Sequence, residues 1–367
     1  MRGKKLIGAL AALACVGLVA AAPAARGQTI DYVFHVSVDG LRPDAITNLG
    51  ALNVPNFYRM RTQGAFTDSA RTDYDYTVTL PSHTTQLTGR PVLGATGHNW
   101  TGNSDPAVGQ TLHTNKGSYV AGVCDVVHDN GRRTGVYASK TKFSLFDTSW
   151  NATNGAPDTT GPDNGRDKVD TYYYNATTTT LTSTLITNTR SNPFRYAFLH
   201  LTDPDTTGHA SSWDPTVGSA YSNTVKTMDA RLGQIFSLID NYAPFSGHSA
   251  IILTADHGGY LYDHSDPTLW QDFKIPFYVW GPGVQAGADL YALNAGLRLD
   301  PGQTGRPTYA APIQPIRNGE AANLALDMLG LGPVPGSTMD YSQNLIVPEP
   351  AAGLLLPLVL VMIRRRR

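Results

Sequence analysis

Residues 251–264 read IILTADHGGYLYDH. The apolar, β-branched run at 251–254 is typical of a buried strand, and it delivers Asp256 and His257 at its carboxyl end. Open α/β sheets bind their ligands at that edge, and His264 follows a short distance along the chain. An acid and two imidazoles here favour a metal site. For this segment alone, an Asp-His-Gly turn capped by its own side chains is an equal alternative.

Two other apolar runs end in the same way. The segment 31–38 has the β-branched and aromatic content of a strand and leads into Asp39, and the segment 194–201 leads into an acid-rich turn with Asp205 and His209. If the three strands are parallel neighbours, their carboxyl ends bring these side chains to one edge of a sheet. Three such ends in one chain favour a shared site over three separate capping turns.

The remaining pattern alternates strands with helices. Strands are predicted at 65–72, 134–138 and 275–281, and helices at 55–64, 84–88, 120–128, 221–242 and 320–329. There is no internal repeat, and no long linker precedes residue 346. The simplest organisation is one α/β domain over residues 27–346. The formal charge of −1 gives no electrostatic reason to expect nucleic acid as a partner.

Both ends of the chain carry targeting patterns. Basic residues, an apolar run and small residues within 1–26 are typical of a secretory signal peptide, with an N-terminal membrane anchor as the alternative. At 347–367, a Val-Pro-Glu-Pro motif precedes thirteen uncharged residues and four arginines. This order resembles the PEP-CTERM sorting signal of Gram-negative bacteria, with a plain tail anchor as the alternative.

The two end patterns together predict an exported protein. The expected location is the periplasm, cell surface or extracellular matrix of a Gram-negative bacterium, and the resemblance implies an exosortase-type partner and transient membrane association through the tail. Cysteine content agrees with export but adds no disulfide, because Cys15 lies in the signal and Cys124 is then alone in the mature chain. Cys124 is predicted to be a buried packing residue.

Aspartate, histidine and hydroxyl side chains are the ligand set of zinc-like divalent ions. Two such ions about 4 Å apart can clamp the attacking and leaving oxygens of a phosphoryl displacement. That chemistry also needs a nucleophile, and both Thr77 and Ser82 are candidates by residue type.

Four motifs lie in order along residues 33–335. They are VDGLR at 38–42, TVTLPSH at 77–83 followed by Thr88 and Gly89, DTTGH at 205–209 and DHG at 256–258. Together they resemble the alkaline phosphatase superfamily, most closely its nucleotide pyrophosphatase/phosphodiesterase branch. The resemblance implies an α/β fold with a central, mostly parallel sheet flanked by helices on both faces.

The resemblance also implies roles for individual residues. The nucleophile position falls on Thr77, and the asparagine that binds a phosphoryl oxygen falls on Asn99, where the spacing departs from the family's by about one residue. Two divalent ions, expected to be Zn²⁺, would have these ligands: Asp39, Thr77, Asp256 and His257 for the first, and Asp205, His209 and His264 for the second. In this branch the last histidine lies much further along the chain, and His264 is the only downstream candidate here.

The predicted function is therefore an exported two-metal phosphodiesterase or nucleotide pyrophosphatase that acts on a small phosphate ester through a phosphothreonine. A phosphomonoesterase with the same core is the alternative, and its dianionic substrate would need a further cation, for which Arg42, Arg90 and Lys140 are available. Another alternative is a non-catalytic surface or matrix protein on this scaffold. A sulfatase is disfavoured, because no Cys or Ser followed by x-Pro-x-Arg occupies the nucleophile position.

Several other residues are predicted to lie outside the chemistry. His35 and His200 fall within strands and are expected to be hydrogen-bonded core histidines. His83 is expected to pack beneath the nucleophile loop. Lys140 and Lys142 follow the strand at 134–138, and the sequence leaves open whether they face the substrate or the solvent.

Overall fold

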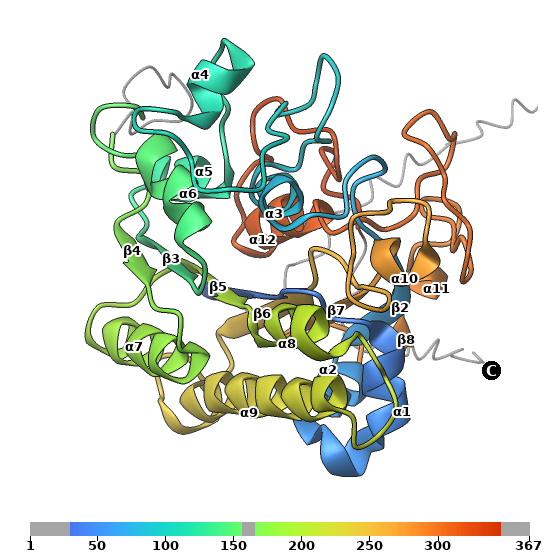
Figure 1. Cartoon of the computed structure of the whole chain (residues 1–367). Helices are drawn as coiled ribbons and strands as arrows, with labels where there is room; N and C mark the ends of the chain where they lie inside the picture. The colour runs from blue at the N-terminus through green and yellow to red at the C-terminus, as the bar shows by residue number, and fades with distance from the viewer. Residues whose placement is uncertain (1–29, 156–165, 346–367) are drawn as a thin grey trace, which may run out of the picture.

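The computed structural model describes residues 30–155 and 166–345, and their strands form one eight-stranded sheet (Figure 1). The strand order is β4-β3-β5-β1-β6-β7-β2-β8. The strands are β1 (Tyr32–Val38), β2 (Ala65–Arg71), β3 (Thr134–Ala138), β4 (Thr171–Tyr174), β5 (Tyr196–Leu201), β6 (Ser249–Thr254), β7 (Lys274–Trp280) and β8 (Ala288–Asp289). Strand β7 is antiparallel to β6 and β2, and the other pairs are parallel.

Helices cover both faces of this sheet (Figure 1). One face carries α1 (Pro43–Asn53), α2 (Pro55–Gln63), α7 (Thr178–Ser191) and α9 (Ala220–Asn241), with α8 (Asp203–Ser211) packed on α9. The other carries α3 (Thr79–Thr88), α5 (Val123–Asp129) and α12 (Glu320–Met328). The shorter helices are α4 (Leu112–Lys116), η1 (Thr141–Phe143), α6 (Ser144–Ser149), α10 (Trp270–Phe273) and α11 (Leu290–Leu293). The predicted fold class is confirmed.

The three strands that carry the acidic ends lie side by side in the middle of the sheet. Strand β1 pairs in parallel with β5 on one side and with β6 on the other, so that Val38 lies opposite Leu201 and Ser37 opposite Thr254. Every residue of β5 and β6 is buried, as expected for strands covered by helices on both faces. The predicted convergence of three carboxyl ends at one edge is confirmed.

The long helix α9 buries its apolar stripe in the core. The stripe consists of Val225, Met228, Leu232, Ile235 and Leu238, all buried. Ser219 caps the helix, because its hydroxyl accepts the main-chain N–H of Ser222. The predicted helix is confirmed, and its stripe is core.

Two local predictions were wrong. The segment 205–209 was expected to be a turn, but it lies within α8, where Pro204 occupies the first turn next to two aspartates that complement the helix dipole. Asp205 and His209 are therefore one helical turn apart on the same face. Helix α3 begins at Thr79, earlier than the predicted start at 84.

The two targeting segments predicted at 1–26 and 347–367 lie outside the described residues. Within the described part of the chain, none of the helices combines the length and the apolar character that a membrane crossing requires. Cys124 is buried and forms no disulfide with the described residues, in agreement with its predicted packing role.

Candidate two-metal site

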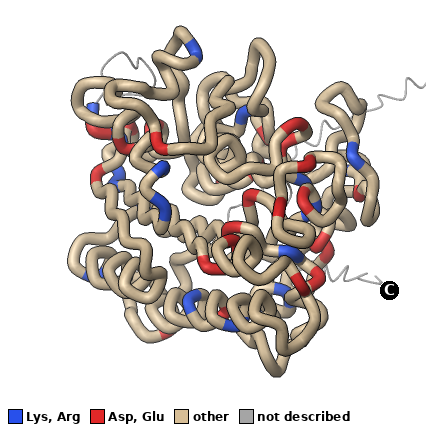
Figure 2. The backbone as a smooth tube through the Cα atoms, in the orientation of Figure 1, with Lys and Arg blue, Asp and Glu red and all other residues tan. Residues whose placement is uncertain are grey.

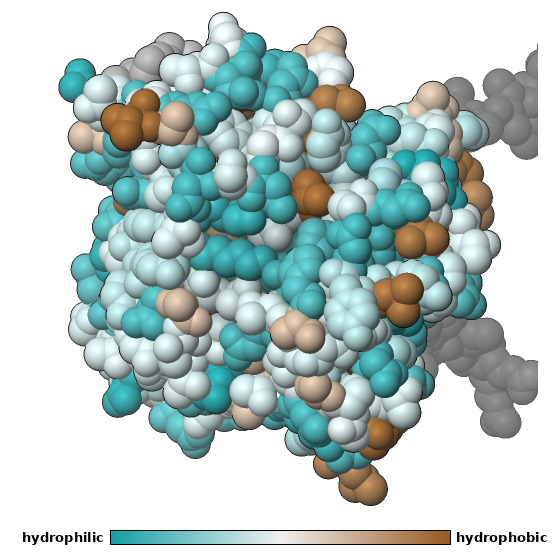
Figure 3. Space-filling model, viewed as in Figure 1, coloured by the Kyte–Doolittle hydropathy of each residue, from teal (hydrophilic) through white to brown (hydrophobic). Residues whose placement is uncertain are grey.

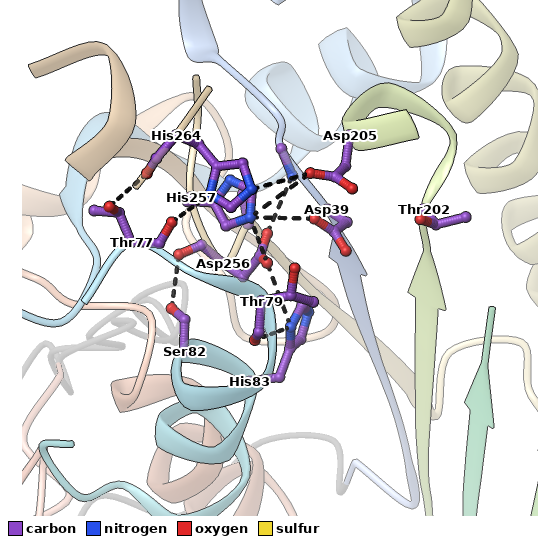
Figure 4. A network of polar contacts seen from close by, with 12 residues as sticks. Asp39, Thr77, Thr79, Ser82, His83, Thr202, Asp205, Asp256, His257 and His264 are labelled. Atoms are coloured by element: carbon purple, nitrogen blue, oxygen red, sulfur yellow. Dashed lines mark hydrogen bonds and ion pairs between the residues drawn. The ribbon is translucent and has the colours of Figure 1, made fainter. Parts of the chain in front are cut away.

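The first cluster of potential metal ligands consists of Asp39, Asp256 and His257, all fully buried (Figure 4). Asp39 directly follows β1, and the other two follow β6. The His257 Nε2 atom lies 3.3 Å from Asp39 Oδ1 and 3.1 Å from Asp256 Oδ2. Two ligands on a tetrahedral ion with bonds of about 2.0–2.2 Å lie roughly 3.3–3.6 Å apart. The cluster has nearly the size that such an ion needs.

The second cluster consists of Asp205, His209 and His264. Asp205 Oδ1 lies 3.5 Å from His209 Nε2 and 3.6 Å from His264 Nε2. It also lies 3.9 Å from His257 Nε2, so the two clusters are adjacent. The rings of His257 and His264 stack with centroids 3.6 Å apart, which joins them across the site (Figure 4).

All three imidazoles present the same nitrogen to the clusters. The Nδ1 atom of each ring lies within hydrogen-bonding distance of a main-chain carbonyl: Gly258 for His257, Tyr262 for His209 and Thr77 for His264. A carbonyl can only accept, so Nδ1–H donates and the Nε2 lone pair faces the carboxylates. Metal-binding histidines are oriented by hydrogen bonds of this kind.

The buried polar atoms of the clusters lack the partners that such atoms normally have. Among the described residues, no hydrogen bond reaches the Oδ1 atoms of Asp39 and Asp205, Oδ2 of Asp256 or Nε2 of His257. Burial and the neighbouring Asp39 raise the pKa of Asp256 well above its usual value, and burial lowers the pKa of His257 well below its own. Neutral imidazoles and converging carboxylates fit divalent cations.

The other oxygen of two of these carboxylates is held by protein. The Lys140 Nζ atom lies 2.7 Å from Asp39 Oδ2 and 2.6 Å from Asp205 Oδ2, one carboxylate from each cluster. Burial would raise the pKa of Asp39, but Lys140 and His200 outweigh it and hold that pKa well below its usual value. Lys140 therefore leaves the Oδ1 atoms of both carboxylates facing the candidate ion positions.

His200 is a positioning residue that sequence reasoning took for a core histidine. Its Nδ1 atom accepts the main-chain N–H of Ser139, so Nε2 carries the proton and donates to Asp39 Oδ2 at 2.9 Å. His35 bonds Tyr196 instead, as expected for a core histidine. The signal that could have separated them is position, because His200 stands next to the end of its strand and His35 does not.

The two candidate nucleophiles differ in their surroundings. Thr77 is buried beside the second cluster, and its hydroxyl donates to the main-chain oxygen of His264 at 2.5 Å (Figure 4). The Ser82 hydroxyl donates to the carbonyl of Asp256 and accepts from Asn318 Nδ2, so it ties α3 to the segment that follows β6. Ser82 is thereby engaged by two distant segments, whereas the Thr77 hydroxyl has one partner next to the second cluster.

The structure gives Asn99 no contact with either cluster. With its carboxamide nitrogen donating, the side chain bonds the carbonyls of Val92 and Gly94 and accepts from Lys116. These contacts favour a loop-stabilising role, and its phosphoryl-binding role stays a prediction. Asn103, which sequence reasoning did not select, instead lies at the N-terminus of α3, where its Oδ1 atom accepts the Leu80 N–H at 2.9 Å.

Trp213 is a second residue that the sequence did not single out. It is buried, and its ring contacts His209 edge-on at 4.8 Å and His264 at 5.6 Å between centroids. A Cβ atom on Gly208 or Gly259 would come within 2.2 or 2.3 Å of this ring. Both glycines are required for the tryptophan to support the second cluster.

The surroundings of the site are polar. In Figure 3, hydrophilic residues line most of the hollowed centre of the face shown, with few hydrophobic ones at its margin. Figure 2 shows basic and acidic positions interspersed over the backbone, without a large region of one sign. This distribution suits a small anionic ligand better than a long polyanion.

The mostly parallel sheet, with aspartates and histidines gathered at the carboxyl ends of β1 and β6, defines an alkaline-phosphatase-like α/β hydrolase. Residues 33–272 match the model of the family described as Type I phosphodiesterase / nucleotide pyrophosphatase. That match covers well over half of the chain, and the chain belongs to this family. Membership supports a phosphoester hydrolase.

Solved structures show the same fold. Murine ectonucleotide pyrophosphatase/phosphodiesterase 5 superimposes with a TM-score of 0.56 at 15% identity, covering 87% of this chain and 100% of the murine chain. An inactive variant of that protein in complex with AMP gives a TM-score of 0.54 at 15% identity, covering 83% and 96%. A 2-O GAG sulfatase gives 0.52 at 10% identity, covering 84% and 72%.

Curated relatives match over a short region. GPI ethanolamine phosphate transferase 1 of Schizosaccharomyces pombe is 31% identical over 104 residues, and that of Neurospora crassa is 34% identical over 94 residues. Each match covers 26% of this chain, and they cover 11% and 9% of the respective transferases. The chain thus spans about a tenth of the length of these relatives.

Proposed function

We propose that this protein hydrolyses phosphate esters at the two clusters, with Thr77 as the nucleophile. The observation that carries the proposal is the convergence of unpartnered buried carboxylate and imidazole atoms next to the Thr77 hydroxyl. A phosphoester hydrolase of this kind agrees with family membership. A threonine-to-alanine variant of the murine structural neighbour is described as inactive, which supports a threonine nucleophile.

Two divalent ions would be held by the two clusters, Asp39, Asp256 and His257 for one and Asp205, His209 and His264 for the other. The family resemblance adds Thr77 as a further ligand of the first ion. When bound, such ions favour the alkoxide form of a threonine and neutralise charge on the oxygens of a transferring phosphoryl group. Zn²⁺ suits this mixed nitrogen and oxygen donor set.

The chain itself positions the reacting group. The Thr77 hydroxyl leaves the His264 carbonyl, and its oxygen forms a bond to phosphorus while the bond to the leaving oxygen breaks; the hydroxyl proton passes to that leaving oxygen. The oxygen of a water molecule then bonds to phosphorus as the bond to the Thr77 oxygen breaks, and one water proton returns to Thr77 while the other stays on the released phosphate group. Because Thr77 is only 1% exposed, the groups that can approach its hydroxyl are restricted to the phosphoryl group of the substrate and water. Lys140 keeps Asp39 and Asp205 in place throughout.

Metal analysis combined with two chromogenic substrates tests this function. The purified protein is expected to contain two equivalents of divalent metal and to hydrolyse p-nitrophenyl phosphate, bis-p-nitrophenyl phosphate or both, as is typical of two-metal sites. The family description supports the diester. Protein that is folded and metal-loaded but hydrolyses neither ester would instead be the non-catalytic scaffold.

We also propose that the protein is exported, supported by the basic, apolar and small-residue order within residues 1–26. N-terminal sequencing of the protein recovered from cell fractions tests this. A chain that begins near residue 27 in the periplasmic, surface or extracellular fraction is the expected result. Recovery only from the cytoplasm with an intact N-terminus would contradict it.

A further inference from the structure

The loop of residues 72–78 joins β2 to α3 and carries the proposed nucleophile. A segment from much further along the chain, residues 306–318, holds the start of this loop. The Arg71 N–H donates to the Ile316 carbonyl at 2.9 Å, and the Asn318 N–H donates to the Arg71 carbonyl at 2.9 Å. The distant segment is therefore fixed beside the point where the loop leaves the sheet.

Two arginines of the distant segment hold the main chain of the loop. The Arg317 Nη1 atom donates to the Thr72 carbonyl at 3.0 Å, and the Arg306 Nη2 atom donates to the Tyr74 carbonyl. The Arg306 guanidinium also lies over the Tyr74 ring, 3.7 Å from its centroid, and that of Arg317 lies 4.5 Å from the ring centroid of Tyr309. The main chain is thereby held on both sides of residue 73.

Asp73 joins these contacts to the residues directly before the nucleophile. It is buried, and its Oδ1 atom accepts the main-chain N–H groups of Asp75 at 2.8 Å and Tyr76 at 3.2 Å. Its Oδ2 atom accepts the Tyr309 hydroxyl at 2.5 Å and the main-chain N–H of Val92 at 2.9 Å. Aspartate side chains stabilise turns by accepting main-chain N–H groups shortly after themselves. One carboxylate thus fixes the turn before the nucleophile and connects it to two other segments.

The hydrogen bond from Tyr309 to this carboxylate is a strong one. Burial and the nearby Asp73 raise the pKa of Tyr309 well above its usual value, so the hydroxyl keeps its proton near neutral pH and donates it. Hydrogen bonds to a carboxylate are stronger than those between neutral groups. Neither Asp73 nor Tyr309 belongs to the two metal clusters. A change at either residue should therefore move the nucleophile loop without removing a metal ligand.

We propose that Asp73 is a positioning residue for the nucleophile and that Tyr309, on the segment 306–318, holds it in place. This inference rests on the proposed function, because it concerns the role of Thr77. Attack on phosphorus requires the reacting oxygen to be held in line, and a misplacement of about 1 Å can lower the rate about 10²-fold. The distant segment lies beyond residues 33–272, which match the family model, so this chain positions its nucleophile with residues outside that match.

The test measures kcat on metal-loaded protein, with whichever nitrophenyl ester the wild type hydrolyses faster. Asp73→Ala removes all four hydrogen bonds of the carboxylate and is expected to lower kcat by roughly 10²-fold. Tyr309→Phe deletes one hydroxyl, which the fold should tolerate, and is expected to lower kcat by roughly tenfold. Both variants should keep two metal equivalents. The inhibition constant of inorganic phosphate should change by less than about threefold, because a misplaced nucleophile affects the transition state and not the binding of the anion.

Tyr278→Phe is the matched control. Its buried hydroxyl also donates to an aspartate, Asp68 Oδ1 at 2.6 Å on β2, and neither residue belongs to the clusters. This variant should lose comparable stability and keep the kcat of wild type. An equal loss of kcat in Tyr278→Phe and Tyr309→Phe, or a phosphate affinity that falls as much as kcat, would overturn the positioning role.

Amide hydrogen exchange tests the same contacts without turnover. In Asp73→Ala, the N–H groups of Asp75 and Tyr76 are expected to exchange at least about tenfold faster than in wild type, while those of β1 and β6 stay unchanged. Unchanged exchange at both N–H groups would contradict the proposal. A metal-loaded wild type that hydrolyses neither ester would refute the proposed function, whereas an active wild type with unchanged kcat in both variants would refute the positioning role alone.

Discussion

Thr77→Ala is expected to lower kcat/KM for p-nitrophenyl phosphate by at least about 10⁴-fold, as is typical when an enzyme loses its nucleophile. The physical reason is that the two neighbouring hydroxyls on the same segment of the described chain already have partners. The Thr79 hydroxyl accepts from Lys140, and the Ser82 hydroxyl is bonded on both sides. Steady-state kinetics on the metal-loaded variant measures the effect.

Two variants serve as controls for that experiment. Ser82→Ala removes a buried hydroxyl from the same segment and is expected to lower kcat/KM less than tenfold, with a stability cost of about 1–3 kcal/mol from the unpaired groups it leaves. Thr77→Ser keeps the hydroxyl and should retain most of the activity that Thr77→Ala loses. Acid-quenched wild type should yield a phosphorylated peptide that contains Thr77. Full activity in Thr77→Ala would falsify the assignment.

Loss of one metal ligand from the first cluster is expected to have the second largest effect on activity. Asp256→Asn keeps the size of the side chain but removes a carboxylate whose Oδ2 atom makes no hydrogen bond with the described residues and faces a candidate ion. We expect this variant to lose one of the two metal equivalents. Its activity should fall by roughly 10³-fold or more, because an ion stabilises the charge of the transition state by several kcal/mol. Plasma emission spectroscopy after dialysis measures the metal content.

The matched variants distinguish metal loss from misfolding. Asp272→Asn changes another buried aspartate, in α10 and outside both clusters, and should retain both ions. His209→Ala changes the exposed ligand of the second cluster and should weaken the other ion without affecting the core. Chelator should lower the melting temperature of wild type, because the ions bind only the folded clusters. Two retained equivalents in Asp256→Asn would contradict the assignment.

The strand ends were predictable because they depend on local composition. The apolar runs before Asp39 and Asp256 are found as β1 and β6, and their carboxyl ends lie side by side as the alternation of strands and helices implied. The prediction that failed between them, the turn at 205–209, failed because a proline and two acids also stabilise a helix start. The outcome depended on packing against α9.

Side-chain roles that depend on contacts between distant segments were not predictable. His200 and His35 look alike as strand residues, yet one holds Asp39 and the other bonds Tyr196. Asn99 and Asn103 lie four residues apart, and only the fold of their loop places Asn103 at α3. Burial and distance across the sheet are properties of the folded chain, so a spacing rule cannot supply them.

By itself the sequence determined the strand ends, the order of the motifs and the set of acids, imidazoles and hydroxyls that could do the chemistry. These follow from hydrophobic periodicity and residue type, which are local. The tertiary structure alone decided that Ser82 ties two segments together, that Lys140 links two carboxylates and that Asn103 accepts from the main chain of α3. Those facts arise because folding brings together residues far apart in the chain, and each polar group's role is set by the partners it meets there.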